Sequence, residues 1–379
     1  MNNLIRFLAL TTILSLLAGR TQAQQTGPTD KLTKAGEHTD DRGLLLGMYF
    51  PAAGENWNSL QDGKWFPEIS DEPHGRYLTF WVSKGGDSVK ILMISGLLAP
   101  RDSGFWRIGS QVVKSKKDPL RNYDEQFWAV PILDKPQMPE TDTGINGKSV
   151  RLLTYVGTEY ISYFSHWQRG AGDWEYIYPH VAAIDTLTKD KTVEQVLGPA
   201  ISASYKRKAK ALDHMNEEPQ NEPCGCCTGS EDEWGITHVR DHWQVFARFH
   251  YGTSSSCAQG SMDEVLATTL PKRLAAGGTL GRPWEVLRQE AEALMKTEPG
   301  SVQHLFVSPR QDLLVALGTH GLAVLGVENL RLRSVLKVQE FDAACIPVME
   351  QWSLGRFASG WDAVIQKEQP AEIPNTENP

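Results

Sequence analysis

The residues with the most distinctive chemistry gather in one short stretch of the chain. This stretch carries four of the five cysteines, which are Cys224, Cys226, Cys227 and Cys257. Clustered thiols form disulfides in an oxidising compartment, or they bind zinc or Cu(I) as thiolates. Their spacing is too crowded for the Cys-x-x-Cys pattern of zinc knuckles, which favours disulfides over a metal. Adjacent cysteines seldom bond to each other, so we expect Cys257 to bond one of the other three.

The fifth cysteine, Cys345, lies far along the chain from the cluster and is expected to be a buried free thiol. Two alternatives to disulfides stay open for the cluster, namely a thiolate cage and redox chemistry. If a metal binds, its ligands are the four clustered cysteines. We expect no metal and no other cofactor, because cysteines of an exported protein usually pair.

A strongly alternating strand, residues 242–251, lies between the clustered cysteines. Its expected hairpin partner is 236–240, with a turn at Arg240-Asp241 that leaves His238 and His242 near each other. On a helix these two histidines would have the spacing of a metal pair. The alternation argues against a helix, and no glutamate follows His238 as a zincin motif requires. A metalloprotease is therefore not favoured.

Aromatic residues suggest a second candidate site. The predicted strand 174–178 places three aromatic residues on one face, and a loop connects it to the predicted strand 160–167. The candidate binding surface consists of Trp167, Arg169, Trp174, Tyr176 and Tyr178. The alternative is that these rings face the core of a sheet.

Local catalytic motifs are not found in the sequence. It contains no Gly-x-Ser-x-Gly turn and no papain-like cysteine neighbourhood. Carboxylate pairs such as Asp173 with Glu175, or those within 231–233, have the chemistry of a glycosidase if their separation is right. We therefore expect no catalytic centre, with a polysaccharide hydrolase as the alternative.

The elements that position these residues are mostly strands. A hairpin is predicted for 76–82 and 89–95, and further apolar runs recur between turn residues. A capping box at Thr192 begins a helix that Gly198-Pro199 interrupts and that continues to residue 215, and a second helix is predicted for 283–296. Residues 349–365 fit a helix or a strand pair. The sequence predicts an α+β fold of mostly antiparallel sheets with two or three covering helices.

The chain divides at changes of composition. Arg6, the apolar run 7–18 and the small residues around Ala23 have the pattern of a secretory signal, and the proline-rich segment 130–147 suggests an internal boundary. The predicted parts are a signal peptide (1–23), a flexible lead-in (24–42), an N-terminal β-rich domain (43–135), a C-terminal α+β domain (148–365) and a polar tail (366–379).

Export follows from this pattern, and we expect a periplasmic or secreted protein. The apolar run is too short for a bilayer span of ~20 residues, so no membrane span is expected. The chain of 379 residues is 40% hydrophobic, which is ordinary for a globular protein, and its net charge is −8. Without a long basic run, the negative charge argues against nucleic acid as a partner.

One resemblance rests on the order of elements between residues 150 and 274. A strand pair ends in a Gly170-Ala171-Gly172 loop, then come the segment 184–188, a helix and a late hairpin with residues 247–251. This order resembles the extracellular ligand-sensing domain of RsiV-type anti-sigma factors and related secreted bacterial domains of uncharacterised function. The resemblance implies a mixed sheet-and-helix domain that binds a partner rather than turning over a substrate.

These observations predict an exported binding or sensing module without a catalytic centre. Its expected partner is a protein or glycan of the cell envelope. Two alternatives remain, a hydrolase that acts on envelope polysaccharide and a thiolate metal-binding protein.

Overall fold

The apolar run 44–50 forms a strand that is buried on both faces. In the computed structural model this strand, β1, belongs to a sheet of order β18-β1-β2-β3. The strands of this sheet are β1 (Arg42–Phe50), β2 (Arg76–Gly85), β3 (Ser88–Ser95) and β18 (Ile346–Leu354). Successive side chains point to opposite faces, so Leu44 and Leu46 enter one hydrophobic core and Leu45 enters another.

The structure describes about two thirds of the chain. The described residues are 41–51, 75–102, 104–115, 122–135, 147–168, 175–215, 233–252, 259–268, 270–271, 274, 277–319, 321–341 and 345–368.

A seven-stranded sheet lies against one face of the β1 sheet. Its order is β10-β9-β8-β7-β6-β5-β4, and every neighbouring pair is antiparallel except the short parallel pairing of β6 with β7. The strands are β4 (Leu97–Arg101), β5 (Gly104–Lys114), β6 (Tyr123–Pro131), β7 (Lys148–Val156), β8 (Tyr160–Gln168), β9 (Glu175–Ala183) and β10 (Thr186–Asp190). Leu45 and Trp81 of the first sheet and Leu153 and Ile161 of the second share one core.

A three-stranded sheet and two helices cover the other face of β7, β8 and β9. The elements are β11 (Trp234–Val239), β12 (His242–Gly252), β13 (Gln259–Ala267), α3 (Val193–Leu197) and α4 (Pro199–Met215). The side chain of Thr192 and that of Gln195 cap α3 reciprocally, and Gly198 ends the helix at a φ of 88°. The predicted capping box and helix break are confirmed.

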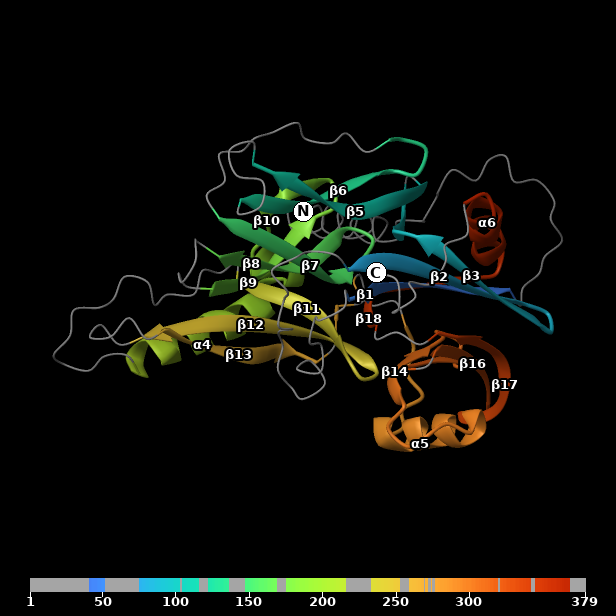
Figure 1. Ribbon diagram of the computed structural model, residues 1–379. Coiled ribbons are helices and arrows are strands. Elements are labelled where there is room, and N and C mark those ends of the chain that lie inside the picture. Colours follow the sequence, from blue (N-terminus) through green and yellow to red (C-terminus); the bar gives the residue numbers. More distant parts are fainter. Residues whose placement is uncertain are drawn as a thin grey trace, which may run out of the picture.

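A four-stranded meander covers the remaining face of the β1 sheet, where β1 and β2 share a core with β15 and β16. Its strands are β14 (Val302–Val307), β15 (Leu313–Gly318), β16 (Gly321–Glu328) and β17 (Arg331–Glu340). Helix α5 (Trp284–Met295) packs Leu287 and Ala291 on the outer face of this meander. Figure 1 shows the meander and α5 in orange at one end of the molecule and the teal strands β5 and β6 at the other.

The last described helix closes the first core. α6 (Arg356–Ile365) follows β18 directly, so the segment 349–365 contains a strand end and a helix. Trp361 contacts Trp81 and Phe105, and Asp362 Oδ1 accepts a hydrogen bond of 2.9 Å from Trp81 Nε1. The buried indole N–H of Trp81 therefore has a hydrogen-bond acceptor that lies 281 positions later in the chain.

The predicted fold class is confirmed. The described chain is dominated by antiparallel sheets, and four helices lie on them. The predicted division between 43–135 and 148–365 falls between β6 and β7 of one sheet, and β18 pairs with β1 from opposite ends of the chain. That division stays a prediction. No helix among the described residues is long and apolar enough to cross a membrane.

Candidate functional site

Five consecutive strands, β6 to β10, contribute to one pocket on the seven-stranded sheet. Its volume is about 500 Å³. The pocket is lined by Gln126, Phe127, Ser149, Arg151, Tyr163, Ser165, His180, Leu187 and Asp190. Residues from β6 and from β10 line the same space, and Phe127 meets Tyr163 edge-on at 5.2 Å between ring centroids. Concave sites with apolar walls and a few convergent polar groups are the usual form of small-ligand sites.

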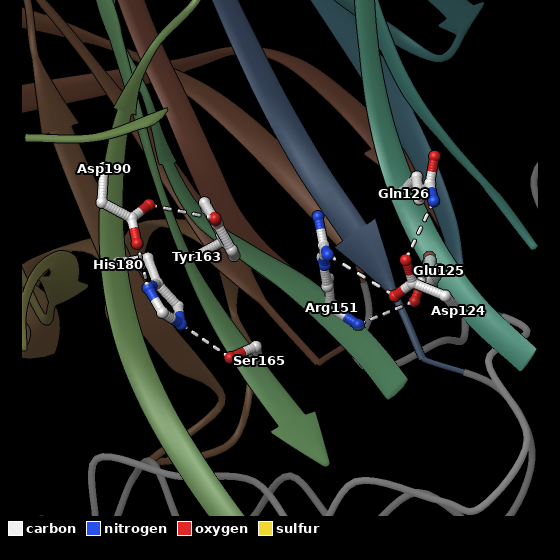
Figure 2. Close-up of polar contacts among 8 residues, drawn as sticks. All are labelled: Asp124, Glu125, Gln126, Arg151, Tyr163, Ser165, His180 and Asp190. Atoms are coloured by element: carbon white, nitrogen blue, oxygen red, sulfur yellow. Dashed lines mark hydrogen bonds and ion pairs between the residues drawn. The ribbon is translucent and has the colours of Figure 1, made fainter. Parts of the chain in front are cut away.

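Three of the lining side chains form a continuous hydrogen-bonded chain. Ser165 Oγ lies 2.7 Å from His180 Nε2, and His180 Nδ1 lies 2.8 Å from Asp190 Oδ2. Figure 2 shows the three residues on neighbouring strands, with the imidazole between the hydroxyl and the carboxylate. β8 and β9 pair Ser165 with Tyr178 and Tyr163 with His180, so strand alternation places these side chains on one face.

The carboxylate determines where the proton of the imidazole lies. An ionised carboxylate only accepts hydrogen bonds, so the N–H at His180 Nδ1 donates a hydrogen bond to Asp190. Nε2 then accepts a hydrogen bond from the hydroxyl of Ser165. Asp190 Oδ1 also accepts from the hydroxyl of Tyr163 at 3.2 Å. Burial, followed by the charge of Asp190, raises the pKa of Tyr163, which keeps that hydroxyl a donor.

A cation lies on β7, the strand next to this chain of hydrogen bonds. Arg151 is the register partner of Ser165, and its guanidinium lies 6.0 Å from the centre of the Tyr163 ring. Arg151 forms an ion pair of 3.4 Å with Asp124, which also accepts from Gln126 Nε2 at 2.9 Å (Figure 2). Arg151 Nε is buried and has no hydrogen-bond partner. Buried donors in folded proteins are almost always paired, so this unpaired nitrogen is an exception.

The predicted aromatic surface reaches the strands that form this pocket. Tyr178 lies in β9, half-buried, with its ring 6.5 Å from that of His180. Trp167 of β8 and Tyr176 of β9 are register partners. Arg169 and Trp174 lie outside the described residues. That these five residues form a binding surface stays a prediction.

The cysteine cluster cannot be placed. The four candidates Cys224, Cys226, Cys227 and Cys257 lie outside the described residues, and no disulfide occurs among those that the structure describes. Cys345 is a buried free thiol, as predicted, and burial raises its pKa. No group of histidine, cysteine and carboxylate side chains in the described part of the chain has the arrangement of a metal site.

The predicted hairpin of β11 and β12 is confirmed, with Arg240 in its turn at a φ of 59°. Its two histidines bond to different partners. His238 Nδ1 lies 3.1 Å from the Nδ1 of His304 in β14, whereas His242 Nδ1 lies 2.8 Å from Asp241 Oδ1. Burial lowers the pKa of His304 to about 4 and also lowers the pKa of His238, which keeps both rings neutral.

Both faces of β12 are covered. Trp243, Val245 and Ala247 enter one core, as the alternation of residues 242–251 allows, and the opposite face packs on another sheet. Phe246 is fully buried and packs against Phe164 of β8 with 5.6 Å between ring centroids. Alternation identifies one apolar face and cannot reveal that a second sheet covers the other.

The carboxylate pairs considered for a glycosidase are only partly described. Asp173 and residues 231–232 lie outside the described residues, and of Glu175 only the place in β9 is given. Sequence reasoning did not identify Arg151, Ser165, His180 or Asp190. The signal for two of them was present, since Ser165 and His180 occur two residues from aromatic positions of the predicted strands.

Comparisons of the chain with protein families, with curated proteins and with solved structures find no match. The resemblance of residues 150–274 to the sensing domain of RsiV-type anti-sigma factors therefore stays a prediction.

Proposed function

We propose that the protein is an exported binding protein of the cell envelope that captures a short, polyhydroxylated saccharide in the pocket between β6 and β10. The observation that supports this proposal is the mixed chemistry of the pocket wall. Half-buried Phe127 and Leu187 lie beside hydroxyl, amide, guanidinium and carboxylate groups. Sugars present both apolar C–H faces and hydroxyls, and aromatic walls with polar neighbours suit both.

The charges of the pocket favour a neutral ligand. Arg151 and Asp190 both line it, so one positive and one negative group offset each other. A sugar hydroxyl both donates and accepts, and it matches a wall that offers donors at Arg151 and Gln126 and acceptors at Ser149 and Asp190. The guanidinium of Arg151 is the cationic donor of this wall, and a ligand oxygen that accepts from it forms a charge-assisted hydrogen bond.

Calorimetric titration of the full chain with N,N′-diacetylchitobiose tests this function. We expect saturable binding that Arg151→Met weakens about tenfold, the equivalent of about 1.4 kcal/mol for a lost hydrogen bond to a charged donor. Arg356→Met is the matched control, because Arg356 lies over Phe357 in α6. The affinity of Arg356→Met for the saccharide should equal that of the unchanged protein. Absence of binding, or an equal affinity for Arg151→Met, would exclude this role of the pocket.

A further inference from the structure

We propose that Ser165 is a nucleophile that removes acyl groups from ester ligands in this pocket. The order of atoms carries the inference: the hydroxyl of Ser165 meets His180 Nε2 at 2.7 Å, and the opposite ring nitrogen meets Asp190 at 2.8 Å. A nucleophile beside a base, with the base oriented by a third group, is the arrangement that activates a serine. The inference rests on the proposed function only for the kind of ester, an acylated saccharide.

All three side chains line the pocket and are therefore within reach of a ligand. The side chain of His180 is 22% exposed and that of Asp190 is 31% exposed, so this is a wall rather than a sealed core network. A purely structural serine bonded across two strands would need no access to a cavity. The accessible position favours chemistry at Ser165.

The imidazole is held in place on two sides. Its ring stacks on that of Tyr163 with centroids 4.9 Å apart and planes 22° apart. The same tyrosine donates its hydroxyl to Asp190, so Tyr163 positions both the base and the carboxylate. In the acyl transfer Tyr163 and Asp190 are positioning residues, because they act through His180 rather than on the reacting atoms. Fixed rotamers of this kind keep reacting groups in a productive geometry.

Arg151 provides a positive group that can stabilise the oxyanion of acyl transfer. It lies directly opposite Ser165 in the antiparallel register, where paired Cβ atoms are about 5 Å apart. A carbonyl bound between the two would place its oxygen toward the guanidinium, whose Nε has no hydrogen-bond partner in the protein. Donors aimed at a developing oxyanion commonly supply a large part of the rate enhancement.

The reaction balances with water as the only co-reactant. Ser165 Oγ attacks the ester carbonyl carbon, and its proton moves to His180 Nε2. The bond between the carbonyl carbon and the alcohol oxygen breaks, and His180 returns the proton to the leaving alcohol. Water then attacks the acyl-serine and gives a proton to Nε2. The bond between Oγ and the acyl carbon breaks, the carboxylic acid leaves, and the proton returns to Oγ.

Labelling with an alkyl fluorophosphonate tests the nucleophile directly. Attack by Oγ forms an Oγ–P bond and breaks the P–F bond, so peptide mass spectrometry should place the label on Ser165. We expect 4-nitrophenyl acetate to release 4-nitrophenolate in the same sample. Ser165→Ala should abolish the label at this position, and His180→Asn should slow labelling at least 100-fold, the usual size of general-base catalysis. Ser359→Ala is the matched control. It removes a hydroxyl of α6 that donates to Asp41, and the labelling of Ser165 should be unchanged.

The outcomes separate this inference from the proposed function. If the unchanged protein binds N,N′-diacetylchitobiose but Ser165 stays unlabelled, the proposal that Ser165 is a nucleophile is overturned and the proposed binding role stays intact. Label at Ser165 without saccharide binding would support the nucleophile and overturn the saccharide. Equal labelling of His180→Asn and unchanged protein would show that His180 does not act as the base.

Discussion

His180 and Asp190 lie on neighbouring strands, with Nδ1 of the imidazole 2.8 Å from Oδ2 of the carboxylate. Asp190 also accepts from Tyr163, so the carboxylate is held by two donors. Ten residues separate the two partners, and the turn between β9 and β10 brings them together. This contact determines which nitrogen of His180 faces Ser165, and the chemistry of the pocket depends on it.

The first prediction concerns the tautomer of His180. Nitrogen NMR of the unchanged protein should show the tautomer that carries its proton on Nδ1, because Asp190 accepts a hydrogen bond from that nitrogen. Asp190→Asn replaces a pure acceptor with an amide that can present a donor, so Nε2-protonated ring should become populated. If the His180 signals were identical in Asp190→Asn and in the unchanged protein, the contact would be contradicted. A purely structural role of Asp190 would leave the tautomer unchanged.

A second prediction concerns the buried Glu350 of β18. Trp243 Nε1 donates to one of its oxygens at 3.0 Å, and Trp352 Nε1 donates to the other at 2.8 Å. Burial nevertheless raises the pKa of Glu350 to about 7 from an ordinary value of 4.5. Between these values the folded chain holds a proton that the unfolded chain has released. The contribution of Glu350 to the free energy of unfolding therefore falls as pH rises from 4.5 through 7.

Trp352→Phe tests this arrangement. At pH 8 it removes a hydrogen bond to a charged carboxylate, at a cost of about 1.5–3 kcal/mol, whereas at pH 5 it removes a bond to a neutral group worth about 1 kcal/mol. Urea unfolding at both pH values measures the difference. Trp284→Phe is the matched control, because the buried Nε1 of Trp284 has no hydrogen-bond partner. Equal losses at pH 5 and pH 8 for Trp352→Phe would show that Glu350 has the same charge at both.

The third prediction compares two glycines. A Cβ on Gly47 of β1 would lie 2.7 Å from Leu97 Cδ2 and 2.8 Å from Met349 Cβ, so Gly47→Ala should destabilise the protein by about 1–3 kcal/mol. A Cβ on Gly360 of α6 would meet no atom within 4 Å. Gly360→Ala should stabilise by about 0.5–1 kcal/mol because glycine is a poor helix residue. Urea unfolding measures both, and the reverse order would contradict the packing around β1.

Local signals in the sequence predict the elements well. The apolar alternation predicts β8 and β12, and the capping box at Thr192 with the break at Gly198 predicts α3 and α4, because short-range chemistry determines these features. The pairing of β1 with β18 is of another kind. It joins Leu44 to Trp352 across most of the chain, and no local pattern specifies that contact.

The pocket was less predictable for the same reason. Ser165 and His180 lie in or beside predicted strands, but their contact depends on the register of β8 against β9. Asp190 reaches His180 only because the pairing of β10 with β9 shifts between Thr186 and Asp190. Arg151 faces Ser165 through one further register. Four residues from four strands meet through three registers that composition and spacing do not determine.

A crystal structure of the full chain with N,N′-diacetylchitobiose would test the central claim most directly, namely that the pocket between β6 and β10 is a ligand site. We predict the saccharide in this pocket, with a hydroxyl or carbonyl oxygen within hydrogen-bond distance of the Arg151 guanidinium and with Ser165 at its edge. A saccharide bound elsewhere, or an empty pocket at saturating concentration, would contradict the account.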